Sequence, residues 1–250
     1  MMDGPYMLIG CEILYREICR HVAACDKVVD FLALEKGLHD LGEARMAARL
    51  QEMIDAVDAK KYTAILLCYG LCNYGTKGLR ADIPIVIPRA HDCITLLLGS
   101  KERYKEYFFA NPGVYYLSSG WIERGRASAD NEDSVPARLG MKVDFDAYDE
   151  DDAEYLKGIL GNWVKNYSKY TLIDTGVGDR AFYADYARDK ARGNGWGLET
   201  LAGDTGLIRD LVDGNWDPGR FLVVPPGYTI KASYDDDVVT AALIEGARAE

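Results

Sequence analysis

The feature that most constrains the fold is a series of short apolar runs, each of which ends abruptly in a loop. Two of them stand close together, at residues 63–67 (TAILL) and 83–87 (IPIVI). An apolar run of four to eight residues bounded by glycine or proline is typical of a strand that is covered on both faces. Helical patterns alternate with these runs, as at residues 43–57. This alternation predicts an α/β fold, Rossmann-like, with a mainly parallel sheet flanked by helices.

The same patterns predict how the chain is divided. Further strands are expected at residues 7–10, 28–34, 114–117, 170–173, 198–201 and 221–224. A polar stretch without periodicity, residues 123–135 (ERGRASADNEDSV), interrupts the series before strand and helix patterns resume. We therefore expect two α/β lobes, formed by residues 1–122 and 123–250. A helix over residues 238–249 is expected to close the fold.

Candidate metal ligands follow each of the first four predicted strands. They come in pairs: Cys11 with Glu12, Glu35 with His39, Cys68 with Cys72, and His91 with Cys93. Because parallel strands bring their carboxyl ends to one edge of a sheet, these side chains are expected to gather there. Thiolate and imidazole are the ligands of zinc, and thiolates also hold iron–sulfur clusters. The spacings match no standard metal motif, and free cysteine is often simply buried, so a structural role stays open.

The zinc hypothesis assigns a role to each of these residues. Six are metal ligands, the first four preferred and the last two alternates: Cys68, Cys72, His91, Cys93, Cys11 and His39. Four more are assigned to the wall of a cofactor site: Glu12, Asp92, Tyr69 and Trp121. Within that wall, the carboxylates of Glu12 and Asp92 would orient an imidazole ligand.

Three other interpretations of the same residues remain open. An iron–sulfur cluster could be held by Cys11, Cys68, Cys72 and Cys93, which would indicate a redox or activating role. Thiol catalysis without a metal would use Cys68 or Cys93, activated by His91. The third is a protein that binds a cofactor or a partner and performs no chemistry of its own.

Composition limits the partners. The net charge of −11 argues against binding to a nucleic-acid backbone and against anchoring to anionic lipid, both of which need a basic face. No apolar run reaches the roughly 18 residues of a membrane span, and the N-terminus lacks the pattern of a signal peptide. We therefore expect a cytoplasmic protein, in which the thiols stay reduced and do not form a disulfide framework.

A glycine-rich turn, residues 174–179 (DTGVGD), follows the strand predicted at 170–173. Glycine-rich turns between a strand and a helix can hold phosphate. This one lacks the full GxGxxG pattern and the lysine of a P-loop, and it is acidic. The sequence alone therefore gives only a weak indication of an anion site here.

Four phrases, AHDCITLLLGSKERY, YYLSSGWIE, YTLIDTGVGD and FLVVPPG, resemble a bacterial and archaeal family called domain of unknown function 1638. The resemblance extends over nearly the whole chain but brings no catalytic residues with it. The resemblance implies that genes of this family lie near genes for corrinoid-dependent methyltransferases. From it we expect a zinc–thiolate protein of corrinoid-linked one-carbon metabolism, a methyltransferase or its accessory factor. Its partner would be a small-molecule or corrinoid-protein methyl carrier. The DxHxxG pattern of corrinoid-binding proteins is absent.

Overall fold

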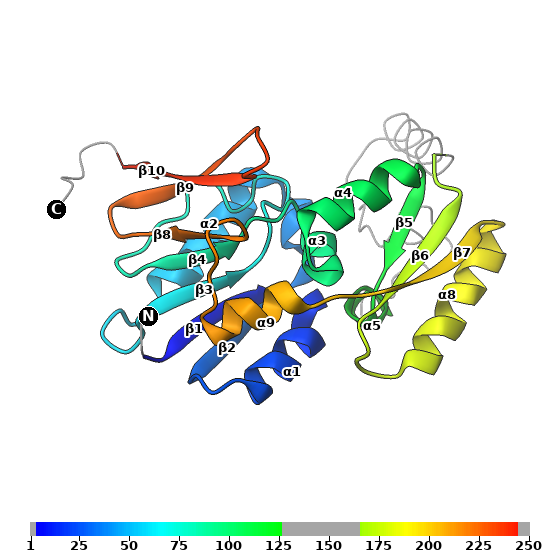
Figure 1. The fold of residues 1–250 in the computed structure, drawn as a ribbon, viewed down its shortest axis with the longest axis horizontal. Helices are drawn as coiled ribbons and strands as arrows, with labels where there is room; N and C mark the ends of the chain where they lie inside the picture. Colours follow the sequence, from blue (N-terminus) through cyan, green and yellow to red (C-terminus); the bar gives the residue numbers. More distant parts are fainter. Residues whose placement is uncertain (1–3, 127–165, 245–250) are drawn as a thin grey trace, which may run out of the picture. The chain divides into compact units, whose positions relative to one another are not determined.

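The computed structural model describes residues 4–126 and 166–244, which form two compact units (Figure 1). The first unit combines Met1–Glu106 with Ala202–Glu250, and the second is Tyr107–Leu201. The sequence predicted a single division after residue 122. The chain instead returns to its first unit, because a strand near its end pairs with the sheet built by the first hundred residues.

The sheet of the first unit has five strands in the order β2-β1-β3-β4-β8. They are β1 (Tyr6–Cys11), β2 (Val29–Leu34), β3 (Ala64–Cys68), β4 (Ile85–Pro88) and β8 (Phe221–Val224). The first four are parallel, and β8 runs antiparallel to β4. The prediction of a mainly parallel sheet flanked by helices is confirmed. Burial on both faces of β3 and β4 explains why apolar runs without alternation marked these two strands.

Helices cover both faces of this sheet (Figure 1). On one face lies α2 (Glu43–Asp55), whose Met46, Leu50 and Ile54 recur every four residues and pack into the core with strand residues. On the other, α1 (Tyr15–Ala24) contacts α9 (Gly206–Asp213), which also contacts β3 and β4. Two 3₁₀ turns follow strands directly, η1 (Glu12–Leu14) after β1 and η2 (Lys36–Leu41) after β2. The helices α3 (Cys93–Leu98) and α4 (Lys101–Ala110) follow β4.

The strand order creates a switch point between β1 and β3. From β1 the chain goes to β2 on one side, and it then crosses to β3 on the other side. In open α/β sheets, ligands bind outside the carboxyl ends of the strands at such a point. Cys11 ends β1 and Cys68 ends β3, so the two thiols flank it.

The end of the chain corrects one prediction. The helix expected over residues 238–249 is wrong for its described part, because β10 (Val239–Leu243) pairs antiparallel with β9 (Tyr228–Ala232). The turn that joins them includes Val238, with a left-handed φ of 64°. Val239 and Thr240 are β-branched, which favours a strand. The pairing of these two segments outweighs the helical spacing that the sequence suggested.

The sheet of the second unit has three strands in the order β5-β6-β7. They are β5 (Val114–Leu117), β6 (Lys169–Asp174) and β7 (Gly197–Ala202), and β5 is parallel to β6. Two helices, α5 (Ser119–Arg126) and α8 (Arg180–Asn194), begin soon after β5 and β6 end. Leu172 of β6 packs with Tyr183 and Ala187 of α8 in a core of its own.

Candidate functional site

Three cysteines gather at the carboxyl edge of the five-stranded sheet. Cys11 and Cys68 end neighbouring strands, and in the register of these strands Gly10 lies opposite Cys68. Cys72 lies four residues further on, in the loop after β3. We call Cys11, Cys68 and Cys72 the thiol cluster. No disulfide joins any of the protein's six cysteines, all of which the structure describes.

The loops that follow β3 and β4 meet in space. The backbone N–H of Leu71 donates to the carbonyl of Ala90 at 2.8 Å, and that of Cys72 donates to the carbonyl of His91 at 2.9 Å. Gly70 makes this approach possible, because a Cβ added there would stand 2.6 Å from the backbone nitrogen of Asp92. The two loops therefore form one paired structure at the edge of the sheet.

The loop after β3 takes an unusual backbone path. Cys72, Asn73 and Tyr74 are consecutive residues with positive φ, at 43°, 54° and 63°. The left-handed region is unfavourable for residues with a Cβ, by roughly 1–2 kcal/mol each. The hydroxyl of Thr76, itself buried, donates to the carbonyl of Gly70 at 3.2 Å and holds the turn. Strain of this kind gathers at functional sites, where the surrounding structure imposes it.

The pKa values of the thiol cluster indicate that its members lie close to one another and are largely shielded from water. Burial, opposed by a hydrogen bond and reinforced by Glu12, raises the pKa of Cys11 to about 11. Burial and then the charge of Asp92 raise that of Cys72 to about 12. The pKa of Cys68 is also raised, first by burial and then by the charge of Cys11. The raised pKa of Cys68 disfavours its thiolate, which is the reverse of an activated nucleophile, so it weighs against Cys68 as the nucleophile of the metal-free hypothesis.

Tyr69 adds an unsatisfied polar group beside the thiols. Its side chain is 3% exposed, and its hydroxyl is buried without a hydrogen-bond partner among the described residues. Burial raises the pKa of this hydroxyl, and the charges of Cys11 and Cys72 raise it further, which places the three groups near one another. Leaving a buried hydroxyl unpaired costs roughly 1–3 kcal/mol, so a native chain keeps one for a reason.

Asp92, which was predicted to orient an imidazole, has a structural role in the described residues. It is the N-cap of α3: its Oδ1 accepts from the backbone N–H of Ile94 at 3.0 Å and of Thr95 at 3.2 Å. Its Oδ2 accepts from the hydroxyl of Tyr104 at 3.1 Å. Cys93 is the first residue of that helix, and His91 is exposed in the loop before it.

The remaining predicted residues lie in several places. Glu12 accepts a hydrogen bond from the backbone N–H of Lys36 at 3.0 Å, which ties the end of β1 to η2. His39 lies in η2, and its side chain is outside the described residues. Trp121 belongs to α5 of the second unit and not to the unit that carries the thiol cluster. In the part of the chain that the structure describes, no three His, Cys, Asp or Glu side chains are arranged to hold a metal ion.

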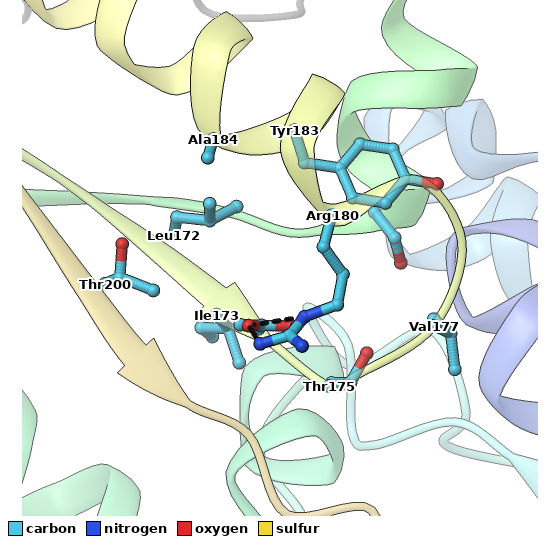
Figure 2. A pocket seen from close by; sticks show the side chains of 10 residues that line it. Leu172, Ile173, Thr175, Val177, Arg180, Tyr183, Ala184 and Thr200 are labelled. Carbon is cyan, nitrogen blue, oxygen red and sulfur yellow. Dashed lines mark hydrogen bonds and ion pairs between the residues drawn. The ribbon is translucent and has the colours of Figure 1, made fainter.

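The second unit has a pocket of its own at the carboxyl ends of β5 and β6 (Figure 2). Its lining is Ser119, Leu172, Ile173, Asp174, Thr175, Val177, Arg180, Tyr183, Ala184 and Thr200. Arg180 forms a two-pronged ion pair with Asp174, with Nε to Oδ1 at 3.0 Å and Nη2 to Oδ2 at 2.5 Å. The glycine-rich turn at residues 174–179 was the signal of this pocket in the sequence, but the pairing of its first residue with Arg180 was not visible there.

Comparison with known proteins places the chain in a family. The model of a family described as protein of unknown function (DUF1638) matches residues 33–212, which is most of the chain. No curated protein and no solved structure matches. Among residues 4–126 and 166–244, no helix is long and apolar enough to cross a membrane. The match over residues 33–212 shows that this chain is a member of the DUF1638 family of proteins of unknown function.

Proposed function

We propose that the thiol cluster binds a soft metal ion, with zinc as the first choice. One observation supports this most: three thiols from two segments, the end of β1 and the end of β3 with its loop, gather at the switch point of a parallel sheet, where open α/β folds bind their ligands. Thiolates are preferred ligands of zinc. An entirely apolar edge would be the simpler way to complete a core, so the polar content of this edge indicates a ligand.

The chemistry of the donor set suits such a metal, although the side chains are not already arranged around one point. Each cysteine has a single side-chain torsion, so small rotations redirect the sulfur atoms without movement of the backbone. The buried hydroxyl of Tyr69 would gain a partner once a neighbouring thiol becomes a thiolate. Because burial raises the pKa of Cys11 and Cys72, metal binding must release their protons, and its affinity should rise with pH.

Cys11, Cys68 and Cys72 would be the protein ligands. His91 and Cys93 are the candidates for a fourth position, because the loop that carries them is hydrogen-bonded to Cys72 through the carbonyl of His91. His39 is the alternate ligand from η2. A zinc ion that keeps one position open acts as a Lewis acid and lowers the pKa of a bound thiol or water.

This chemistry fits methyl transfer to or from sulfur. We therefore propose a role in corrinoid-linked one-carbon metabolism, as a methyltransferase or as its accessory factor, in the cytoplasm. The partner would be a small-molecule or corrinoid-protein methyl carrier. The corrinoid link rests on the genomic company that the family resemblance implies. An iron–sulfur protein, or a binding protein without chemistry, is the alternative.

The test is the metal content of the full chain, purified without oxygen, by elemental analysis together with its visible spectrum. We expect about one zinc per chain in the wild type and a loss of most of it in Cys11→Ala and Cys72→Ala. Cys25→Ala is the matched control, because the Cys25 thiol donates to the nearby carbonyls of Val22 and Lys27 and lies outside the thiol cluster. Both cluster variants should remain folded by circular dichroism.

Each other outcome has a defined meaning. Iron with sulfide and a broad visible band would replace zinc with the iron–sulfur alternative. A wild-type chain that binds no metal, even after incubation with zinc, would overturn the proposal and favour a binding protein with structural cysteines. The same conclusion would follow if Cys11→Ala, Cys72→Ala and Cys25→Ala all retained the same metal content.

A further inference from the structure

The pocket of the second unit lies where a parallel sheet exposes the ends of its strands. Leu117 of β5 lies opposite Leu172 of β6, so Ser119 and Asp174 follow at the same edge. The helices α5 and α8 begin at this edge, at Ser119 and Arg180. The proposed metal site is built by another unit of the chain, so whatever this pocket binds has to be inferred from its own residues.

An ion pair fixes the position of the Arg180 guanidinium but engages only some of its hydrogen-bond donors. In Figure 2 its side chain runs down between Thr200 on one side and Val177 on the other. A guanidinium carries five N–H donors. The ion pair with Asp174 engages Nε and Nη2, and within residues 4–126 and 166–244 the edge formed by Nη1 has no partner and could meet a ligand. The Asp174 carboxylate thus fixes the orientation of a cation whose outer edge lines the pocket.

The loop between β6 and α8 is shaped by two glycines. Gly176 and Gly178 have φ values of 76° and 67°, a region that side chains rarely adopt. A Cβ on Gly178 would stand 2.1 Å from the hydroxyl oxygen of Tyr183, which itself donates to Glu123 of α5. The hydroxyl of Tyr183 therefore packs against the bare backbone of the loop. This contact fixes the path of the loop along the pocket.

The lining is divided between donors and apolar groups. Hydroxyls come from three different elements, with Ser119 in α5, Thr175 in the loop and Thr200 in β7. Apolar side chains, Ile173 and Val177 among them, complete the wall. The cavity measures about 50 Å³, which is room for one compact group and not for a whole cofactor.

We propose that this pocket binds the phosphate group of a small phosphorylated metabolite. Polar groups from α8 and β7, Arg180 and Thr200, line the cavity, and a tetrahedral phosphate group presents three terminal oxygens in different directions, whereas a planar carboxylate presents only two. Arginine suits phosphate because its planar fork donates two parallel hydrogen bonds. The start of α8 is capped by Asp179, whose carboxylate accepts from the backbone N–H of Phe182 at 3.0 Å, so the attraction for an anion comes from Arg180 and not from the helix dipole. The negative charge of Asp174 is offset by Arg180 and by the backbone N–H of Gly176, at 3.0 Å.

The test is a titration of the full chain, free of metal, with inorganic phosphate at constant ionic strength. The amide signals of Gly176 and Gly178 in nitrogen-15 spectra report directly on the loop. We expect saturable shifts of both signals and a dissociation constant about tenfold higher in Arg180→Gln. Arg188→Gln is the matched control, since it removes the same charge from the same helix and Arg188 pairs with Asp185, outside the pocket lining. It should change the dissociation constant by less than about twofold. These two limits follow from the one or two charge-assisted hydrogen bonds that Arg180 would supply.

Acetate in place of phosphate distinguishes a general anion site from a phosphate site, and we expect it to bind about tenfold more weakly. The proposal is overturned if neither glycine signal shifts in a saturable way, if acetate binds as tightly as phosphate, or if Arg180→Gln and Arg188→Gln weaken binding equally. Because no metal is present in this titration, its result is independent of the proposed zinc site.

Discussion

The two units place different chemistry at the same position of their sheets. In the first unit, the carboxyl edge carries the thiol cluster and Tyr69. Cys68 and Tyr69 are buried, Cys11 and Cys72 are partly buried, and burial raises the pKa values of Cys11 and Cys72. In the second, the carboxyl edge carries an arginine, a carboxylate and three hydroxyls around an open pocket, and the Arg180 guanidinium lowers the pKa of Asp174. We call the edge of the first unit, whose sulfur donors are largely shielded from water, the dry edge. We call the edge of the second unit, whose charged groups contact water, the wet edge.

This difference shows how far topology alone can indicate function. Parallel strands determine where a ligand binds, because the loops that can vary all leave the sheet at one edge. The side chains on those loops then determine what kind of ligand it is. Sulfur donors that are shielded from water suit a metal ion, which displaces the thiol protons when it binds. Charged and polar groups in contact with water suit an anion, which binds in its ionised form. The predictions below test this contrast between the edges.

The largest effect is expected from Gly70→Ala, which disturbs the dry edge directly. The new methyl group would stand 2.6–2.9 Å from backbone atoms of Ala90 and Asp92, and backbone cannot rotate away as a side chain does. We expect a loss of about 3 kcal/mol in the free energy of unfolding of the first unit, at the upper end of overpacking costs. Urea unfolding measures the total. Faster hydrogen exchange at the amides of Leu71 and Cys72 would show that the two loops separate.

Gly37→Ala is the control for this substitution. Gly37 lies in η2, and a Cβ added there would meet nothing within 4 Å. We expect it to change the free energy of unfolding by less than about 0.5 kcal/mol. Equal stability of Gly70→Ala and Gly37→Ala would show that the loops after β3 and β4 are not packed as closely as the hydrogen bonds between them indicate.

The second effect is a loss of stability of the metal-free protein at alkaline pH. Burial raises the pKa of Cys11 from 9.0 to about 11, so the unfolded chain releases this proton before the folded one does. The folded state then binds more protons than the unfolded state, and stability falls as the pH rises from about 9 to 11. For Cys11 alone the loss at the end of this range is about 2 kcal/mol.

Urea unfolding at pH 8 and pH 11 measures this loss, and the variant Cys11→Ala isolates it from the titration of tyrosines and lysines. The wild type should lose about 2 kcal/mol more than Cys11→Ala between the two pH values, and Cys25→Ala should behave as the wild type does. Because the thiol is buried, added salt should leave the difference nearly unchanged. An identical pH response in all three proteins would mean that Cys11 is not in a dry environment.

Much of the fold could be predicted from the sequence, because buried strands have continuous apolar sequences that are easy to locate. Residues 114–117 and 221–224 were assigned as strands with the bounds that β5 and β8 have. Long-range pairing was not visible. Nothing in the run FLVV shows that it pairs antiparallel with β4, and this pairing is what returns the end of the chain to the first unit. The segment after residue 238 was misread for the same reason, since β10 depends on β9.

The candidate sites were visible only in part. Residue type and position after a strand pointed to Cys68 and Cys72 as preferred ligands and to Cys11 as an alternate, because strand ends fix the edge on which a loop lies. The cap formed by Asp92 had a local signal, an aspartate directly before an apolar helix, which competes with a role in ligand binding. Trp121 was grouped with the first lobe because it is near in sequence, but it belongs to the second unit. The pairing of Asp174 with Arg180 depends on the path of the loop, which the sequence does not specify.

The smallest predicted effect is the stabilisation by the Asp174–Arg180 ion pair at the wet edge. This stabilisation is lost at acid pH, whereas that of the Cys11 thiol is lost at alkaline pH. The Arg180 guanidinium, through its hydrogen bonds, lowers the pKa of the Asp174 carboxyl below its ordinary value of 3.8. The folded state therefore holds this carboxylate more strongly than the unfolded chain does. The stabilisation is complete above the ordinary pKa and is lost as the pH falls through the lowered one. Because Arg180 is well exposed to water, this contribution to stability is small and is screened by salt.

Carbon-13 spectra of the aspartate carboxyls, followed over acid pH, measure the titration of Asp174 directly. Its pKa should lie below the ordinary value in the wild type, return toward it in Arg180→Gln, and rise with added salt. Arg188→Gln should leave it unchanged, since Arg188 pairs with Asp185 elsewhere on α8. The buried thiols of the first unit are expected to be insensitive to salt. If the pKa of Asp174 were equally insensitive to salt, this edge would be as well shielded from water as the edge of the first unit. The contrast from which we infer two different classes of ligand would then no longer hold.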